Sequence, residues 1–224
     1  MSVVPVPVLY EDNHLLVVIK PPGLPVQADR SGDPDLQREL KNYLKEKYQK
    51  PGNVFLGLVH RLDRPVGGVM VLGRTSKGAA RLSEQIRNRT FRKTYIAQVE
   101  GCPEPLEGRL SHWLLKDRQR NVVEVVSPGA PAAREAILRY KVLSPVGESL
   151  NLVEVDLETG RPHQIRVQFA RIGCPLVGDR KYGATRGEGD LGLWSFAIEF
   201  RHPTRDEIMR FEAPDYPFRA EPCL

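Results

Sequence analysis

The sequence predicts an α+β fold in which a mixed, mostly antiparallel sheet is flanked by helices and loops. Two observations carry this prediction: strand-like segments outnumber helical ones and several are consecutive, and a strict strand–helix–strand alternation is absent. Pro and Gly, 19 of each, separate short elements, with no internal repeat or long linker between them. The 224 residues suffice for one large domain or two small ones, and we expect a single domain over 1–224.

The first third of the chain contains two strands and then a helix. Residues 6–10 and 14–20 are expected to be strands joined by a short polar turn, and the second strand ends in the turn Lys20-Pro21-Pro22-Gly23. In the helix that follows, Asp33 is expected to be the N-cap and Pro34 to lie in the first turn. The apolar residues of this helix recur at helical spacing at Leu36, Leu40, Tyr43, Leu44 and Tyr48.

Two further apolar runs, 54–59 and 69–73, are short enough to be buried strands, and a largely polar stretch separates them. Thr75 or Ser76 is then expected to begin a second helix that ends near Asn88. The inward positions of this helix are expected to be Ala79, Leu82 and Ile86.

The second half is expected to be mostly strands. Residues 109–115 and 122–126 can form a hairpin, and four other segments alternate along one face. The alternating sets are Tyr95, Ala97 and Val99; Ala136, Leu138, Tyr140 and Val142; Trp194, Phe196, Ile198 and Phe200; and Met209, Phe211 and Ala213. One amphipathic helix interrupts them, with Pro162 near its start, Ile165 and Phe169 on its buried face and Gly173 as its terminator.

Composition excludes several classes of protein. With 41% hydrophobic and 27% charged residues, the chain has the composition of a soluble globular protein, and no apolar run approaches the ~20 residues of a membrane span. The N-terminus lacks the pattern of a signal peptide. Cys102, Cys174 and Cys223 form no CxxC pair, which argues against a disulfide scaffold or a cysteine zinc site and favours a cytoplasmic protein.

The net charge of +5 is unevenly distributed along the chain. Residues 74–95 include seven basic residues and one acidic residue, and residues 161–186 include six basic residues and one acidic residue. The first block is Arg74, Lys77, Arg81, Arg87, Arg89, Arg92 and Lys93, and the second is Arg161, Arg166, Arg171, Arg180, Lys181 and Arg186. Acids concentrate elsewhere, at Glu148, Glu154, Asp156 and Glu158. Such blocks favour a surface that faces a polyanion, although on charge alone two solvated helix faces explain them as well.

Asp63 is the most prominent candidate for chemistry. It is flanked by Arg61 and Arg64 in a turn between two apolar runs, where nearby positive charge would hold its carboxylate ionised. An ionised and positioned carboxylate can act as a nucleophile or a general base. The alternative is a structural Arg–Asp pair that closes the loop.

Two other segments supply further candidates. Residues 158–166 lie at the expected start of a helix, where free backbone N–H groups favour an anion. There Arg161 and Arg166 could pair with Asp63 or hold phosphate, and Gln164 could cap the helix or contact RNA. Tyr95, among basic residues, could stack on a base, although a tyrosine on a strand is more often part of the core.

Taken together, these motifs resemble those of RluA-type pseudouridine synthases, in order and over about residues 8–214. The motifs are Glu11-Asp12-Asn13 with residues 16–23; His60-Arg61-Leu62-Asp63; Lys93-Thr94-Tyr95-Ile96-Ala97-Gln98-Val99-Glu100-Gly101; Thr159-Gly160-Arg161-Pro162-His163-Gln164-Ile165-Arg166; Gly173-Cys174-Pro175-Leu176-Val177-Gly178-Asp179; and Lys181-Tyr182-Gly183.

The resemblance implies the pseudouridine synthase fold and a cofactor-free isomerase that converts uridine in RNA to pseudouridine. It places the catalytic aspartate at Asp63 and, at Arg61, an arginine that helps to hold the substrate site open. Tyr95 matches the tyrosine that stacks on the target uracil and is proposed to take part in proton transfer. Arg166 matches the basic residue that pairs with the aspartate, beside the apolar contact Ile165.

The same resemblance implies that no metal is needed, that the target base leaves its stack, and that the basic blocks bind the RNA backbone. The expected partner is rRNA or tRNA, the expected state a monomer, and Lys20 is expected to support the site as a turn residue. Pro65, Val66 and Gly67 stand where the family commonly has polar residues, which we expect to alter loop packing rather than chemistry. Only residues 1–5 precede the first expected strand, so we expect no S4-like RNA-binding module.

Two other functions are compatible with parts of this sequence. A metal-dependent hydrolase would use His60, Asp63 and His163, but the five histidines of the chain are scattered and form no HExxH-like array. We therefore expect His60 and His163 to be structural hydrogen-bonding residues. A catalytically inert RNA-binding protein on the same fold is the other alternative, although a pure binder has no need of Asp63.

Overall fold

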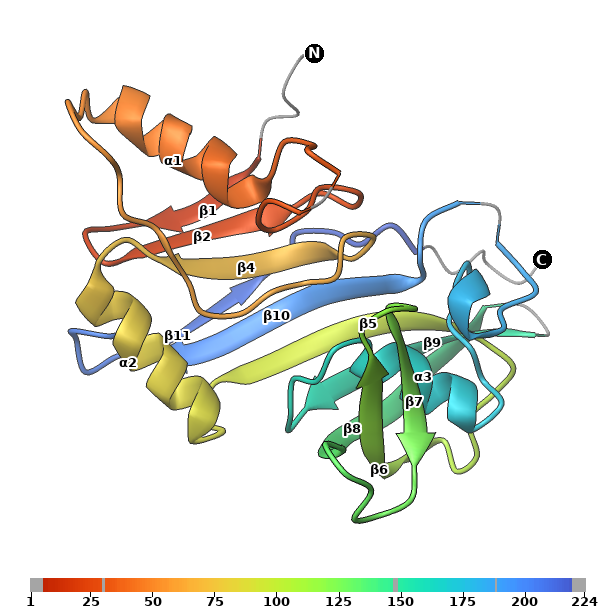
Figure 1. The fold of residues 1–224 in the computed structure, drawn as a ribbon. Helices are drawn as coiled ribbons and strands as arrows, with labels where there is room; N and C mark the ends of the chain where they lie inside the picture. The colour runs from red at the N-terminus through yellow and green to blue at the C-terminus, as the bar shows by residue number, and fades with distance from the viewer. Residues whose placement is uncertain (1–5, 30, 147–148, 188, 219–224) are drawn as a thin grey trace. The chain divides into compact units, whose positions relative to one another are not determined.

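The computed structural model describes residues 6–29, 31–146, 149–187 and 189–218, so that Cys223 and Glu148 lie outside the described residues (Figure 1). The chain divides into two compact units. Unit 1 contains Met1–Arg92 and Ser195–Pro214, and unit 2 contains Lys93–Trp194 and Asp215–Leu224. No helix in the described ranges is long and apolar enough to cross a membrane. That all 224 residues act as one domain stays a prediction.

Unit 1 is built on a sheet with the strand order β1-β2-β4-β10, in which β3 also pairs with β4 and β11 with β10. The strands are β1 (Val8–Glu11), β2 (Leu15–Lys20), β3 (Gly57–Leu58), β4 (Gly67–Gly73), β10 (Leu193–Arg201) and β11 (Ile208–Glu212). The centre of this sheet is fully apolar: Leu15–Val18 of β2 and Val69–Leu72 of β4 have no exposed surface. The two strands predicted at 6–10 and 14–20 are confirmed as β1 and β2, and they pair antiparallel.

The helices of unit 1 are α1 (Leu36–Lys47) and α2 (Ser76–Arg87). The predicted cap of α1 is wrong: Asp35, in extended conformation, accepts the N–H of Arg38 at 3.0 Å. Asp33 lies two residues too early for this bond, and its carboxylate instead pairs with Arg64. α2 begins at Ser76, one of the two predicted starts, and the Thr75 side chain caps it by accepting the N–H of Gly78 at 3.1 Å. The expected strand at 54–59 is only the two residues of β3.

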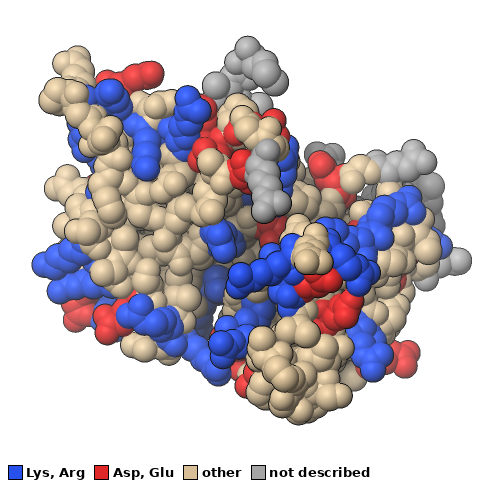
Figure 2. All heavy atoms as spheres, viewed as in Figure 1, with Lys and Arg blue, Asp and Glu red and all other residues tan. Residues whose placement is uncertain are grey.

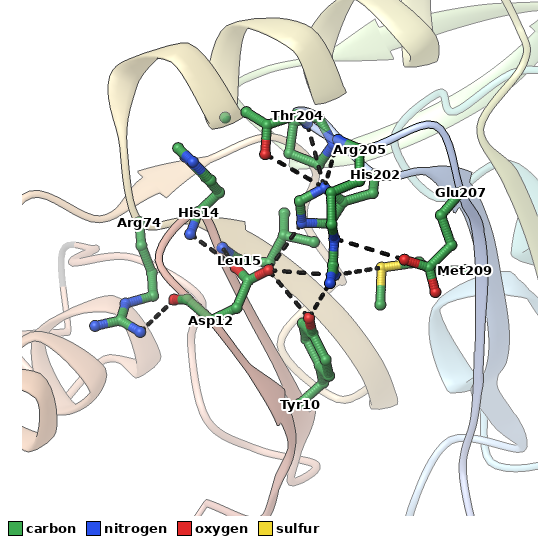
Figure 3. Close-up of polar contacts among 12 residues, drawn as sticks. Tyr10, Asp12, His14, Leu15, Arg74, His202, Thr204, Arg205, Glu207 and Met209 are labelled. Atoms are coloured by element: carbon green, nitrogen blue, oxygen red, sulfur yellow. Dashed lines mark hydrogen bonds and ion pairs between the residues drawn. The ribbon is translucent and has the colours of Figure 1, made fainter.

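Asp12 ties the two ends of unit 1 together (Figure 3). One carboxylate oxygen accepts the N–H groups of His14 and Leu15, and the other contacts Tyr10, His202 and Arg205. Nδ1 of buried His202 lies near two backbone N–H groups, so Nε2 carries the proton that is donated to Asp12 at 2.8 Å. Burial opposes the charge of Asp12, but these hydrogen bonds hold its pKa below the usual value.

Unit 2 contains a fully antiparallel set of strands with the order β5-β9-β8-β6-β7. They are β5 (Arg92–Glu100), β6 (Glu107–Asp117), β7 (Val122–Val126), β8 (Arg134–Val146) and β9 (Leu150–Leu157). The hairpin predicted at 109–126 is confirmed as β6 and β7. The helix α3 (Gln164–Arg171) packs its Val167 against Leu114, Val123 and Ala136 of these strands, and a 3-10 turn follows at Arg180–Tyr182.

Together these elements confirm the α+β prediction with mostly antiparallel strands. β9 was not predicted, although it pairs with both β5 and β8. Leu152, Val153 and Val155 are all buried, so the strand lacks the clean alternation of a half-buried strand. Glu154 and Asp156 also prevent a continuous apolar run, which is the pattern of a strand buried on both faces.

Candidate active site

Asp63 lies in the loop that connects β3 to β4 in unit 1. It is half-buried, and Leu62 and Val66 on either side are buried in the core. The N–H of Val66 donates to the carbonyl of Asp63 at 3.0 Å, which closes a tight turn. Two apolar anchors and a turn therefore fix the backbone around Asp63, and the departure at Pro65-Val66-Gly67 supplies one of those anchors.

Lys20 joins this loop to the end of β2. Its side chain is fully buried, and the ammonium donates to the carbonyls of Pro21, Leu24 and Arg64 at 2.8–3.0 Å. The Arg64 carbonyl also accepts a second hydrogen bond, from the N–H of Gly23 at 2.9 Å. The Lys-Pro-Pro-Gly turn is thus bonded directly to the residue that follows Asp63.

The charge of Lys20 also acts on Asp63. Burial lowers the pKa of Lys20 to about 8, while the Asp63 carboxylate opposes that shift. The structure thus gives a physical basis for the supporting role that the sequence suggested for Lys20. Its ammonium binds backbone carbonyls of the segment after β2 and of the Asp63 loop, and it interacts electrostatically with Asp63. The three bonds could not be read from the sequence, because they end on backbone carbonyls up to 44 positions away.

The two arginines that flank Asp63 are exposed. The Arg64 guanidinium donates to the carbonyl of Gly23 at 3.0 Å and to the carboxylate of Asp33 at 2.6 Å. Much of the positive charge of Arg64 is therefore neutralised by groups of the surrounding loops. Arg61 presents its side chain to solvent on the other side of Leu62.

Gly68 sets the position at which β4 begins. Its φ is +115°, and a Cβ on it would lie 2.2 Å from the carbonyl oxygen of Ser195. The hydroxyl of Ser195 in turn donates to the carbonyl of Val69 at 3.0 Å. Only glycine permits this approach, so the residue fixes the start of β4, where the Asp63 loop ends.

In unit 2, Tyr95 lies on β5 opposite Val155 of β9 and is 6% exposed. Side chains two apart on a strand lie on the same face, so Tyr95 shares its face with Lys93. The predicted place of Tyr95 on a strand is confirmed, and its contact with a uracil stays a prediction.

The loop that leads into α3 is closed by Gln164. Its amide oxygen accepts from Thr159 Oγ1 at 2.8 Å and from the N–H of Arg161 at 3.0 Å, and its Nε2 donates to the carbonyl of Ile137 at 3.0 Å. These bonds reach the 159–161 segment and Ile137 of β8 and no backbone N–H of α3, so they are not a helix cap; contact of Gln164 with RNA stays a prediction. The Arg161 guanidinium is exposed and donates to the carbonyl of Glu135 at 2.9 Å.

Arg166 and Ile165 are both buried in the first turn of α3. Arg166 forms a two-bond ion pair with the buried Asp179, at 2.7 Å for each bond, and its guanidinium lies 5.1 Å from the ring centroid of Tyr182. These partners lie 13 and 16 positions along the chain, in motifs that the sequence had singled out without linking them. Pairing between Arg166 and the proposed catalytic aspartate stays a prediction.

The histidines of the rival metal site have structural partners. His60 Nε2 accepts the N–H of Val71 at 3.1 Å, and His163 Nδ1 lies 2.7 Å from the hydroxyl of Tyr182. Within the described residues, no three His, Cys, Asp or Glu side chains form a group that could hold a metal ion. The geometry gives the metal-dependent hydrolase no support.

Comparison with known proteins decides the family. A family model described as RNA pseudouridylate synthase matches residues 14–171. The chain belongs to this family. At 35% identity over 210 residues it is similar to YhcT, an uncharacterized RNA pseudouridine synthase of Bacillus subtilis, with 92% of this chain and 68% of the relative covered. It is 32% identical to the ribosomal large subunit pseudouridine synthase D of Zymomonas mobilis, over 94% of this chain and 69% of that one.

Among solved structures, human RNA pseudouridylate synthase domain containing 4 superimposes with a TM-score of 0.79 at 25% identity, covering 94% of this chain and 89% of that one. The resemblance drawn from the sequence motifs is thereby confirmed, as are the pseudouridine synthase fold and the function. This RNA pseudouridine synthase is an isomerase whose substrate is RNA.

Proposed function

We propose that Asp63 is the catalytic residue of this pseudouridine synthase and that the enzyme isomerises specific uridines in rRNA or tRNA. The observation that carries the proposal is the attachment of the Asp63 loop by Lys20, which donates three hydrogen bonds to backbone carbonyls while its charge faces the Asp63 carboxylate. Fixing a carboxylate in advance of substrate binding is what an electrostatic or nucleophilic role requires.

The reaction detaches uracil from C1′ of the ribose, turns it while it is still bound, and rejoins it through C5. The Asp63 carboxylate either attacks C1′ or abstracts a sugar proton, and both routes are compatible with a half-buried acid. No group leaves for another molecule and no redox step occurs, so the proposed chemistry calls for no cofactor and no metal. The target nucleotide has to leave its base stack to reach Asp63.

Six further residues have proposed roles toward the substrate or the fold of its site. Tyr95 would stack on the target uracil, Ile165 would contact it, and Arg166 would act beside the aspartate. Arg61 would hold the substrate site open, and Arg161 would bind RNA phosphate from its exposed position at the start of α3. Gln164 would support the site by keeping the 159–164 loop closed.

Ribosomal RNA is the substrate to test first, because a relative over nearly the whole chain is named for the large ribosomal subunit. Transfer RNA is the alternative. Pseudouridine mapping across all cellular RNA, with and without the gene, would identify the target and separate the two. We further propose that the enzyme acts as a cytoplasmic monomer without an obligate protein partner, which light scattering of the purified protein would check.

The decisive variant is Asp63→Asn. The change keeps the shape of the side chain and removes no positive charge, so we expect pseudouridine formation to fall by at least about 10²–10⁴-fold while RNA affinity stays nearly unchanged. The assay uses total RNA from a strain that lacks the gene. Asp190→Asn, the same change on an exposed loop residue of unit 2, is the matched control and should keep full activity.

Two outcomes would contradict the proposal. Full activity of Asp63→Asn would remove Asp63 from the chemistry, and a wild-type protein that binds RNA without modifying any uridine would be the inert binder. Loss of activity on addition of a chelator would instead favour the metal-dependent hydrolase.

A further inference from the structure

Lys93 is a buried cation without a counter-charge among the residues that the structure describes. It lies near the start of β5, is 9% exposed, and forms no hydrogen bond or ion pair with the part of the chain that the structure describes. Burial lowers the pKa of Lys93. Lysine is rarely buried without a partner because removing an ammonium from water is costly. Lys20, the other deeply buried lysine in the described ranges, has three carbonyl acceptors.

Gly160 leaves the space that the Lys93 ammonium occupies. A Cβ on Gly160 would lie 2.9 Å from Lys93 Nζ, closer than real Cβ contacts allow. The φ of Gly160 is not in the left-handed region, so no backbone conformation there demands glycine. Within the Thr-Gly-Arg-Pro-His-Gln motif, the absence of a side chain at Gly160 therefore makes room for the Lys93 ammonium, which has no binding partner among the described residues.

The position of Lys93 connects it to the residues with proposed roles at the target uridine. Lys93 and Tyr95 are two apart on β5 and so lie on one face of that strand. Gly160, against which Nζ lies, is followed directly by Arg161, and the same loop leads to Ile165 at the start of α3. All of these residues belong to unit 2.

We propose that Lys93 binds a phosphate of the RNA backbone next to the target uridine. The uracil that would stack on Tyr95 is neutral, whereas an anion offers a buried ammonium the strongest compensation for its lost hydration. The phosphodiester is the anion that every RNA nucleotide carries, and phosphate contacts set the register of a nucleic acid on a protein without reading its sequence. The inference rests on the proposed substrate role of Tyr95, and it assigns Lys93 to positioning the nucleotide rather than to the chemical step.

The test is Lys93→Met, which keeps the length of the side chain and removes the charge. The exposed residue Lys45 on α1 supplies the matched control, Lys45→Met. The rate is followed as tritium released from total RNA labelled with [5-³H]uridine in a strain that lacks the gene, since pseudouridine formation frees the C5 hydrogen. We expect the apparent KM for RNA to rise by about 10- to 100-fold, the effect of a lost charge-assisted hydrogen bond, with kcat at saturating RNA little changed.

Salt dependence and stability separate a phosphate contact from a structural role. One lost phosphate contact should reduce the slope of log(kcat/KM) against log[salt] by about 0.7–0.9. The urea midpoint of Lys93→Met should equal or exceed that of the wild type, because the substitution removes a buried charge that no described residue pairs with. A lysine that holds the fold together would give the opposite result, a lower midpoint.

Gly160→Ala provides a second variant that leaves the charge in place. The added methyl group displaces only the flexible end of the Lys93 side chain, so the protein should fold while the ammonium moves away from its position. We expect KM to rise in this variant also. In the Lys93→Met background the same substitution should add little, because both changes act on one contact.

The inference can fail separately from the proposed function. RNA binding is measured with Lys93→Met added to Asp63→Asn protein, so the result does not depend on turnover. Unchanged KM, unchanged affinity and an unchanged salt slope in the Lys93 variants would overturn the phosphate role, whatever Asp63 does. An inactive wild type would instead count against the proposed function, and weaker binding by Lys93→Met would still support the phosphate contact.

Discussion

At the scale of single residues, the two buried lysines place opposite demands on the fold. Lys20 is fully buried but has three carbonyl acceptors and the nearby charge of Asp63, and these favour its protonated form. Lys93 has no such partners among the described residues. The contacts of Lys20 are those of a residue that orders a loop, and the burial of Lys93 without such contacts is typical of a ligand-binding residue.

Lys20 gives a pH dependence whose sign follows from its pKa. Burial lowers that pKa from 10.5 to about 8, so between these values the unfolded chain holds a proton that the folded chain has lost. Stability from this residue therefore rises with pH from about 8 to 10.5, by at most about 3 kcal/mol. Over the same rise, kcat should fall through pH 8 as the charge that faces Asp63 disappears.

Urea unfolding and kcat profiles of wild type and Lys20→Met would measure both effects. The variant loses a donor for three carbonyls, so it should be less stable throughout, but it should lack the rise in stability above pH 8 and the step in kcat. Lys45→Met, altered at an exposed lysine, should keep both. A wild-type and Lys20→Met pair with parallel profiles would show that another group titrates.

At the scale of elements, the junction of β4 and β10 determines where the Asp63 loop ends. We expect Gly68→Ala to lower the free energy of unfolding by about 3 kcal/mol or more, because a Cβ at φ +115° would meet the backbone of Ser195. Activity should fall with it, since relieving the overlap moves the end of β4. Chemical denaturation and the tritium assay would measure the two losses.

Gly129→Ala separates the overlap from the backbone conformation. Gly129 also has a positive φ, +84°, but a Cβ there would have nothing within 4 Å. Its substitution should cost only about 1–2 kcal/mol, with activity unaffected. If both alanine variants were equally stable, the close approach of Gly68 to Ser195 would have no energetic weight.

Elements with local signals were predictable, and those that depend on distant partners were not. The start of α2 at Thr75 or Ser76 and the β6–β7 hairpin follow from neighbouring residues, and both are confirmed. β9 escaped prediction because pairing on both sides buries it while its acidic residues break the apolar run. At the candidate site, the sequence singled out Asp63 and Arg166, but the Lys20 bonds and the Arg166–Asp179 pair became visible only when the fold joined separate motifs.

At the scale of the whole molecule, the sequence blocks overstate the charge that is available to RNA. Arg74 forms an ion pair with Glu11 at 3.0 Å that leaves its side chain only 9% exposed, and Arg166 is paired with Asp179. What remains of the first block lies mainly on and after α2, where Lys and Arg side chains reach the surface in Figure 2. Arg89 also lines a groove of about 770 Å³ beside the turn between β10 and β11, together with Arg81, Arg92, Arg201 and Arg205.

This distribution predicts that the end of α2 contributes affinity for RNA and none of the chemistry. Replacing Arg87 and Arg89 by Glu should weaken binding and reduce the slope of log Kd against log[salt] by at least about 1.4–1.8, because two exposed cations no longer displace counterions. The value of kcat at saturating RNA should stay unchanged. Filter binding at several salt concentrations and the tritium assay would measure the two properties.

The control is Arg38→Glu with Lys45→Glu, which makes the same charge change on exposed residues of α1, outside both basic blocks. If net charge alone attracted the RNA, the two double variants would weaken binding equally, because each shifts the total of +5 by the same amount. A local RNA-binding surface instead predicts a clear loss at α2 and a small one at α1. Equal losses would therefore show long-range attraction by the whole molecule, and a larger loss at α1 would place the RNA on the other helix of unit 1.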